Sequence, residues 1–204
     1  MSKELALLPA SKLAKLLRRG KASPVEALNA VFAQIDKLNP ILNAFQAQDR
    51  EGALKAARAS EKRWKKGKPL SPIDGVPTTI KDTLWTIGMP TLFGTKANDP
   101  RGPWDQDAPA PASLRAAGAV IFAKTTTPEY GWKGVTDSPL FGITRNPWNT
   151  EKPPGGSSGG SAASLAAGMG TLSVGTDAAG SVRIPSSFSG LATLKATFAR
   201  VPVY

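Results

Sequence analysis

The sequence predicts an α/β fold in which helices alternate with short apolar strands. A capping box at Ser23–Glu26 opens an amphipathic helix. Three short apolar runs, Val76–Ile80, Ala119–Ala123 and Leu172–Val174, have the length and composition of buried strands. With 204 residues and 41% hydrophobic content, the chain can bury a substantial core. These observations together favour a layered α/β architecture.

The first third of the chain is predicted to be helical. A short helix over about residues 11–19 ends at Gly20. The capping box, with Pro24 at the first helical position, starts a longer helix that we expect to end near Asn39 and Pro40. A third amphipathic helix covers about residues 49–66.

The remaining elements surround long polar segments. The strand Val76–Ile80 carries Lys81 at its C-terminal end, and residues 82–111 are rich in Gly, Pro and Asp, which predicts a long functional loop. After this loop we expect, in order, a helix (about 111–117), the strand 119–123, a second loop to about 154, a helix (161–168) and the strand 172–174.

Composition excludes several kinds of chemistry. The chain has no cysteine and no histidine, so disulfides, thiolate nucleophiles and the usual zinc or copper sites are not expected. We expect no metal and no cofactor. No apolar run reaches the roughly 18 residues of a membrane span, and the N-terminal residues resemble no signal peptide. A cytoplasmic protein without a membrane partner is therefore expected.

The positive charge is concentrated in the helical N-terminal part. The net charge is +11, and residues 1–70 hold 15 Lys and Arg against 6 Asp and Glu, a balance of +9. The charged residues lie in amphipathic helical segments without an accompanying aromatic platform for base stacking. We interpret them as solvated helix faces, and nucleic acid is not an expected partner.

Two serines in separate glycine-rich turns are the main candidates for chemistry. Ser157 lies in Gly155-Gly-Ser-Ser-Gly-Gly-Ser161, and Ser181 follows Gly180. Serine hydroxyls beside free backbone N–H groups suit acyl transfer. The α/β-hydrolase elbow needs a histidine, the penicillin-binding pattern needs Ser-x-x-Lys, and a P-loop needs a lysine after its glycines, and this chain has none of these.

Activation of a serine by a lysine remains as the compatible chemistry. A lysine can act as a base only when neutral, so burial must lower its pKa by about 3 units. Lys81 follows an apolar strand that would enclose its side chain, whereas the lysines at 62–68 lie on solvated faces. The structural alternatives are an ion pair between Lys81 and Asp82, and ordinary glycine-serine loops around both serines.

Three motifs in the same order resemble the amidase signature family of Ser-Ser-Lys amide hydrolases. They are Gly75-Val-Pro-Thr-Thr-Ile-Lys-Asp82, Pro154-Gly-Gly-Ser-Ser-Gly-Gly-Ser161 and Gly175-Thr-Asp-Ala-Ala-Gly-Ser-Val-Arg-Ile-Pro185. The resemblance extends from the capping box to Pro202 and includes Arg145-Asn-Pro-Trp-Asn149. It implies a layered mixed β-sheet flanked by helices.

The resemblance also implies roles for individual residues. Ser181 would be the nucleophile, Ser157 the bridging serine after a cis peptide bond from Gly156, and Lys81 the base. The N–H groups of Ala178, Ala179, Gly180 and Ser181 would form the oxyanion hole, supported by Ser158, Thr176, Asp177 and Arg183. The family often has glycines where this chain has Ala178 and Ala179, which should narrow the turn but keep its donors.

Family members are much longer than this chain. We therefore expect residues 1–204 to be the N-terminal part of a single amidase domain truncated at its C-terminus, with a helical segment over about 1–70 and a catalytic core over about 71–204. The expected function is amide hydrolysis of a small-molecule substrate through an acyl-enzyme, and a homodimer of the full-length protein stays open. The alternatives are the tRNA-dependent glutamyl amidotransferase, of which the chain would be the amidase component, and an inactive fragment or basic binding module.

Overall fold

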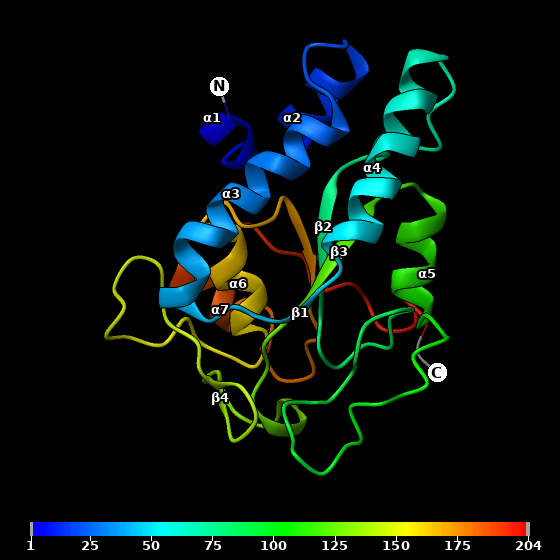
Figure 1. The fold of residues 1–204 in the computed structure, drawn as a ribbon. Helices are drawn as coiled ribbons and strands as arrows, with labels where there is room; N and C mark the ends of the chain where they lie inside the picture. The colour runs from blue at the N-terminus through cyan, green and yellow to red at the C-terminus, as the bar shows by residue number, and fades with distance from the viewer. Residues whose placement is uncertain (1, 203–204) are drawn as a thin grey trace.

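The structure is a computed structural model that describes residues 2–202, with side chains from Glu4 onward. A four-stranded sheet in the order β1-β3-β2-β6 forms its centre, and helices pack around it (Figure 1). Its strands are β1 (Phe45–Gln48), β2 (Pro77–Lys81), β3 (Val120–Thr125) and β6 (Leu172–Val174). β1 runs antiparallel to β3, and β2 is parallel to both of its neighbours. The sheet is therefore mixed, as predicted.

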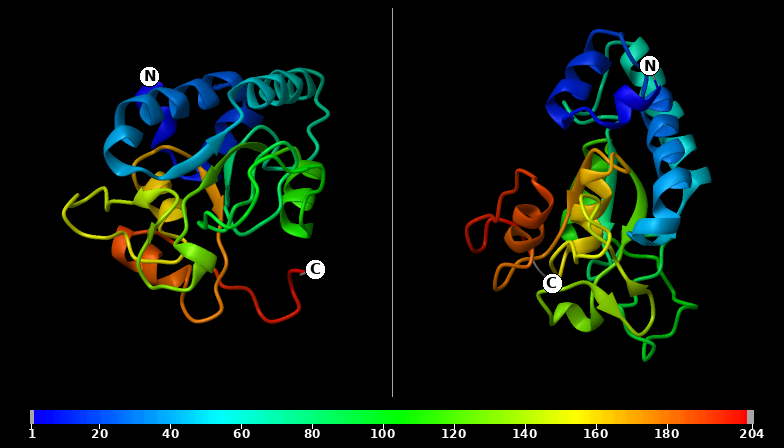
Figure 2. Two further views of the ribbon diagram at one scale, coloured as in Figure 1. Left: turned by 60° about the horizontal axis from the view of Figure 1, so that its bottom comes forward. Right: turned by 90° about the vertical axis from the view of Figure 1, so that its left-hand side faces the viewer.

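The other elements are helices and one small ribbon. The helices are α1 (Ser2–Ala6), α2 (Ala10–Arg18), α3 (Pro24–Leu42), α4 (Arg50–Lys65), α5 (Pro109–Ala116), α6 (Gly159–Ala166), α7 (Arg183–Ser189) and the 3-10 turn η1 (Glu129–Gly131). The strands β4 (Asp137–Ser138) and β5 (Gly142–Ile143) form a separate antiparallel pair. Figure 2 shows α1 to α4 gathered at one end of the molecule and η1 and β4 at the other.

The predicted capping box is confirmed, but the predicted end of its helix is wrong. The Ser23 hydroxyl accepts a hydrogen bond from the Glu26 N–H, and Glu26 accepts one from the Ser23 N–H. α3 continues past Pro40 to Leu42 and stops at Asn43, whose φ of 51° is left-handed. Pro40 lies in the last turn, where only one main-chain hydrogen bond is lost, so the helix tolerates it.

The two faces of the sheet carry separate apolar clusters. Val120 and Phe122 of β3 pack into the main core with residues of α3, α4 and α6. Ile121, between them in sequence, packs with Ile80 of β2 and Met89 in a second cluster, against which Leu114 of α5 lies. This alternation follows from the two-residue period of a strand. Both strands are fully buried, as expected for parallel strands covered on both sides.

Sequence patterns missed three elements, α1, β1 and α7. β1 is a short edge strand with the sequence Phe-Gln-Ala-Gln, which carries too few apolar residues to give a clear pattern. α7 contains Pro185 in its first turn, where proline is tolerated. The long loops were placed correctly, except that α5 begins at Pro109, slightly before the predicted position. None of the helices in residues 2–202 is long and apolar enough to cross a membrane.

Candidate active site

Lys81 is the last residue of β2 and is completely buried. Its Nζ lies 2.6 Å from the Ser157 hydroxyl oxygen and 2.9 Å from that of Thr176. Burial lowers the pKa of Lys81 to about 7, although the negative charge of Asp177 partly opposes the shift. A large fraction of Lys81 is therefore neutral near neutral pH.

The alternative ion pair between Lys81 and Asp82 does not form. The buried Asp82 carboxylate instead accepts hydrogen bonds from the Leu92 N–H at 3.0 Å, the Gly94 N–H at 3.0 Å and the Gln46 amide at 2.8 Å. Asp82 therefore fixes the start of the long loop, while Lys81 is left to contact hydroxyl groups alone. Burial raises the pKa of Asp82, and these hydrogen bonds together with the charge of Lys124 oppose that rise.

The glycine-rich segment holds Ser157 immediately before α6. The Gly156–Ser157 peptide bond is cis, as the family resemblance implied. The glycines that follow allow α6 to approach its neighbours closely. A Cβ on Gly159 would lie 2.2 Å from the Thr136 hydroxyl oxygen, and one on Gly160 would lie 2.3 Å from that of Thr126. Any larger residue at these positions would push the start of α6, and with it Ser157, away from Lys81.

Ser181 lies in the turn between β6 and α7, next to the Ser157 segment. Its carbonyl accepts a hydrogen bond from the Ser158 N–H at 3.0 Å, which joins the two serine-containing turns. Ser158 also makes two contacts to the main chain of Thr176, at 3.3 and 3.4 Å. Within residues 2–202, the Ser181 hydroxyl makes no hydrogen bond to another residue. It is half-buried and therefore accessible.

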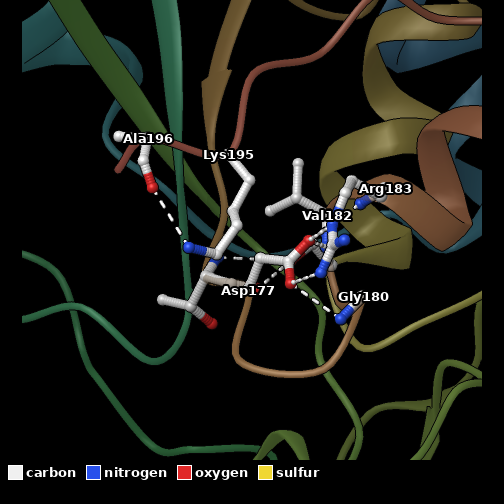
Figure 3. Close-up of polar contacts among 8 residues, drawn as sticks. Asp177, Gly180, Val182, Arg183, Lys195 and Ala196 are labelled. Atoms are coloured by element: carbon white, nitrogen blue, oxygen red, sulfur yellow. Dashed lines mark hydrogen bonds and ion pairs between the residues drawn. The ribbon is translucent and has the colours of Figure 1, made fainter. Parts of the chain in front are cut away.

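Asp177 organises the turn that contains Ser181. Its carboxylate accepts hydrogen bonds from the N–H groups of Gly180 (2.7 Å), Val182 (3.1 Å) and Arg183 (3.2 Å) and from the Arg183 guanidinium (3.0 Å), as Figure 3 shows. The Arg183 hydrogen bonds are the main reason that the pKa of Asp177 is held well below its usual value. Asp177 is thus charged throughout the pH range in which proteins fold.

The Asp177 contacts divide the expected oxyanion donors into two groups. The Gly180 N–H is engaged by Asp177. The N–H groups of Ala178, Ala179 and Ser181 donate no hydrogen bond to any residue in the described range. Ala178 and Ala179 are exposed, and Gly180 has a φ of 112° that only glycine adopts readily. The turn consequently offers three unpaired donors beside the Ser181 hydroxyl.

Sequence analysis missed a second buried lysine, Lys124 of β3. Its Nζ donates to the Leu84 carbonyl, to the Thr91 hydroxyl at 2.7 Å and to the Thr86 hydroxyl at 3.3 Å. Burial lowers the pKa of Lys124 to about 8, and the charges of Asp82 and Asp107 partly oppose the shift. Like Lys81, it follows an apolar strand, so the same sequence signal was present for both residues.

Strand register separates the two lysines. Lys124 pairs with Ile80, and Lys81 pairs with Thr125. Since paired residues of adjacent strands project to the same side and successive residues to opposite sides, Lys124 and Lys81 lie on opposite faces of the sheet. Lys81 shares its face with α6, because Thr125 contacts Ser161 there at 2.7 Å. Only Lys81 can therefore reach Ser157.

Comparison with known proteins assigns the chain to a family. The sequence profile of the amidase family matches residues 26–204. The chain is 42% identical to the indoleacetamide hydrolase of Bradyrhizobium diazoefficiens, over 94% of this chain and 36% of that protein. It is 40% identical to the amidase component of the glutamyl-tRNA(Gln) amidotransferase of Chloroflexus aggregans, over 98% of this chain and 41% of that one.

Solved structures agree with the sequence comparisons. A bacterial aryl acylamidase of the amidase signature family superimposes with a TM-score of 0.82 at 35% identity, over 88% of this chain and 37% of that one. The chain belongs to the amidase family. It spans about two fifths of the length of the relatives that it matches.

Proposed function

We propose that the chain carries the catalytic residues of an amide hydrolase that works through a covalent acyl-enzyme. In this proposal Ser181 is the nucleophile, Ser157 the bridging proton carrier and Lys81 the base. The observation that carries it is the buried Lys81 amine, with its pKa lowered to about 7, at 2.6 Å from the Ser157 hydroxyl. A general base works best when its pKa lies near the working pH.

The contacts of Lys81 suit this role. A neutral amine has two N–H bonds and one lone pair. When Lys81 donates to Thr176 at 2.9 Å, its lone pair is available to accept the Ser157 proton. Thr176 would therefore orient the amine.

Acylation then proceeds by proton relay. Ser157 passes its proton to Lys81 and takes the proton of Ser181 as the Ser181 oxygen forms a bond to the amide carbonyl carbon. The carbonyl oxygen becomes an oxyanion. Collapse of this intermediate breaks the C–N bond, and Ser157 delivers a proton to the leaving amine while recovering one from Lys81. Water repeats the sequence on the ester, which releases the acid and restores Ser181.

The N–H groups of Ala178, Ala179 and Ser181 are the proposed oxyanion donors. Removing one such donor from an enzyme typically reduces the rate by about 100- to 1,000-fold. The Gly180 N–H contributes indirectly in this scheme, because its bond to Asp177 holds the turn in shape. Asp177 and Arg183 thus support the donors without touching the substrate.

Two alternatives concern the class of protein. Relatives of both hydrolase and amidotransferase type match at similar identity. We favour a stand-alone amidase, because Gly175-Thr-Asp-Ala-Ala-Gly-Ser181 differs from the Ser-Asp-Thr-Gly-Gly-Ser typical of the amidotransferase component. An inactive fragment or a basic binding module would keep the fold without the reactive serine.

A serine-directed probe tests the proposal. We expect a fluorophosphonate to label the chain at Ser181, identified by peptide mass spectrometry, and Ser181→Ala to abolish labelling. Ser187→Ala is the matched control, because this serine is exposed on α7 and should leave labelling unchanged. Labelling that persists in Ser181→Ala, or an unlabelled wild-type chain, would contradict the assignment.

A further inference from the structure

The turn η1 lies directly against the Lys81–Ser157 pair. A Cβ placed on Gly131 would lie 3.3 Å from the Ser157 hydroxyl oxygen and 3.8 Å from the Thr83 methyl carbon. The main chain of Gly131 is therefore in van der Waals range of the proposed bridging serine. Whatever the residues on either side of Gly131 present to solvent borders the place where a substrate must bind.

Both of these neighbours are exposed aromatic residues. Trp132 is 89% exposed and Tyr130 is 59% exposed. A third aromatic ring, Phe93, lies 6.2 Å from Tyr130, at an interplanar angle of 34°. Clustered exposed aromatic side chains beside a reactive group typically mark a binding surface. The proposed mechanism uses none of these rings.

The main chain holds this cluster in an unfavourable conformation. Phe93 has a φ of 56° and Tyr130 a φ of 51°, in the left-handed region that bulky residues avoid. The Tyr130 N–H donates to the Phe93 carbonyl at 2.7 Å, and Asp82 binds the N–H groups on both sides of Phe93. Such conformations persist where the surroundings enforce them, and they concentrate at functional sites. The two aromatic segments are thus fixed to each other.

We propose that Phe93, Tyr130 and Trp132 form an aromatic wall of the substrate site and select amides that carry a planar aromatic group next to the scissile bond. This inference rests on the proposed amide hydrolysis for the identity of the reacting group. A planar ring can stack on the wall, whereas a saturated ring of similar size gains only the burial of apolar area. The wall therefore discriminates by shape and π-system as well as by hydrophobicity.

Binding can be measured without hydrolysis. In the Ser181→Ala chain, phenylacetamide is compared with cyclohexylacetamide by NMR titration. Acetanilide is compared with N-cyclohexylacetamide to learn whether the acyl or the amine side of the substrate faces the wall. We expect at least one aromatic ligand to bind about 3- to 10-fold more tightly than its saturated partner.

Substitution of the wall completes the test. Trp132→Ala should remove most of that preference without changing Tm, because the indole is 89% exposed. Trp148→Ala is the matched control: this indole is also exposed, but it donates to the Ser189 carbonyl at the end of α7. Equal binding of aromatic and saturated ligands, no binding of any ligand, or a preference that survives Trp132→Ala would overturn the aromatic wall.

The outcomes for the wall and for amide hydrolysis are separable. An aromatic preference in binding, combined with failure of the fluorophosphonate to label Ser181, would support the wall and contradict the proposed chemistry. Labelling of Ser181 without any aromatic preference would do the reverse.

Discussion

The pH dependence of Ser181 acylation follows directly from the environment of Lys81. With a pKa of about 7, Lys81 is about half neutral at pH 7 and about 1% neutral at pH 5. An ordinary lysine would be only about 0.03% neutral at pH 7. Because only the neutral amine can accept the Ser157 proton, the labelling rate should fall about 50-fold from pH 7 to pH 5 and level off above pH 8.

The assay is the second-order rate of fluorophosphonate labelling between pH 5 and pH 9. Lys81→Met should reduce the rate by several orders of magnitude and flatten its pH profile. Lys124→Met is the matched control, since this second buried lysine lies on the opposite face of the sheet and contacts no serine of the site. A wild-type rate that is flat from pH 5 to pH 9 would refute the role of Lys81.

The same pKa shift predicts a pH-dependent effect on stability. The folded chain releases the Lys81 proton near pH 7, but the unfolded chain releases it near pH 10.5. Between these values the unfolded state binds more protons, so the wild type gains stability as pH rises. Lys81→Met lacks this cost, and its advantage should be largest below pH 7, at most roughly 5 kcal/mol, and should decline towards pH 10.5.

Two further substitutions test buried polar contacts away from Ser181. Lys124→Met leaves three buried oxygens without their donor, and we expect a loss of about 2–4 kcal/mol in denaturant unfolding, with faster amide exchange around Met89; unchanged exchange there would count against a role in holding the loop. Asp74→Asn should cost about 3 kcal/mol at pH 7, because buried Asp74 binds the Arg63 guanidinium at 2.6 and 2.8 Å. Burial alone would raise the pKa of Asp74, but hydrogen bonds led by that from Arg63 hold it below 3.8, so this difference should shrink as pH falls below that value; a pH-independent difference would contradict the ion pair.

Local sequence determined the elements whose signals are short-range. The Ser23–Glu26 capping box fixed the start of α3, because its two hydrogen bonds join residues three apart. The apolar runs at β2, β3 and β6 predicted their strands for a similar reason. The weakly patterned β1 was missed, and the end of α3 was placed too early at Pro40, since both depend on packing with distant residues.

The candidate site shows the same division. The motifs indicated Lys81, Ser157 and Ser181 through a family resemblance, and composition excluded a histidine-based mechanism. An apolar strand followed by lysine occurs at both Lys81 and Lys124, and nothing in that local pattern separates them. Strand register does, because Lys81 pairs with Thr125 on the face covered by α6, while Lys124 pairs with Ile80 on the other face.

The sequence by itself therefore determined which residue types could react and which short segments would fold. Only the tertiary structure decided which lysine loses its proton and which aromatic residues border the reactive serines. Desolvation of Lys81 and the approach of Gly131 to Ser157 both arise from segments far apart in the chain. Their energies depend on what surrounds a group in space, and a one-dimensional pattern does not contain that information.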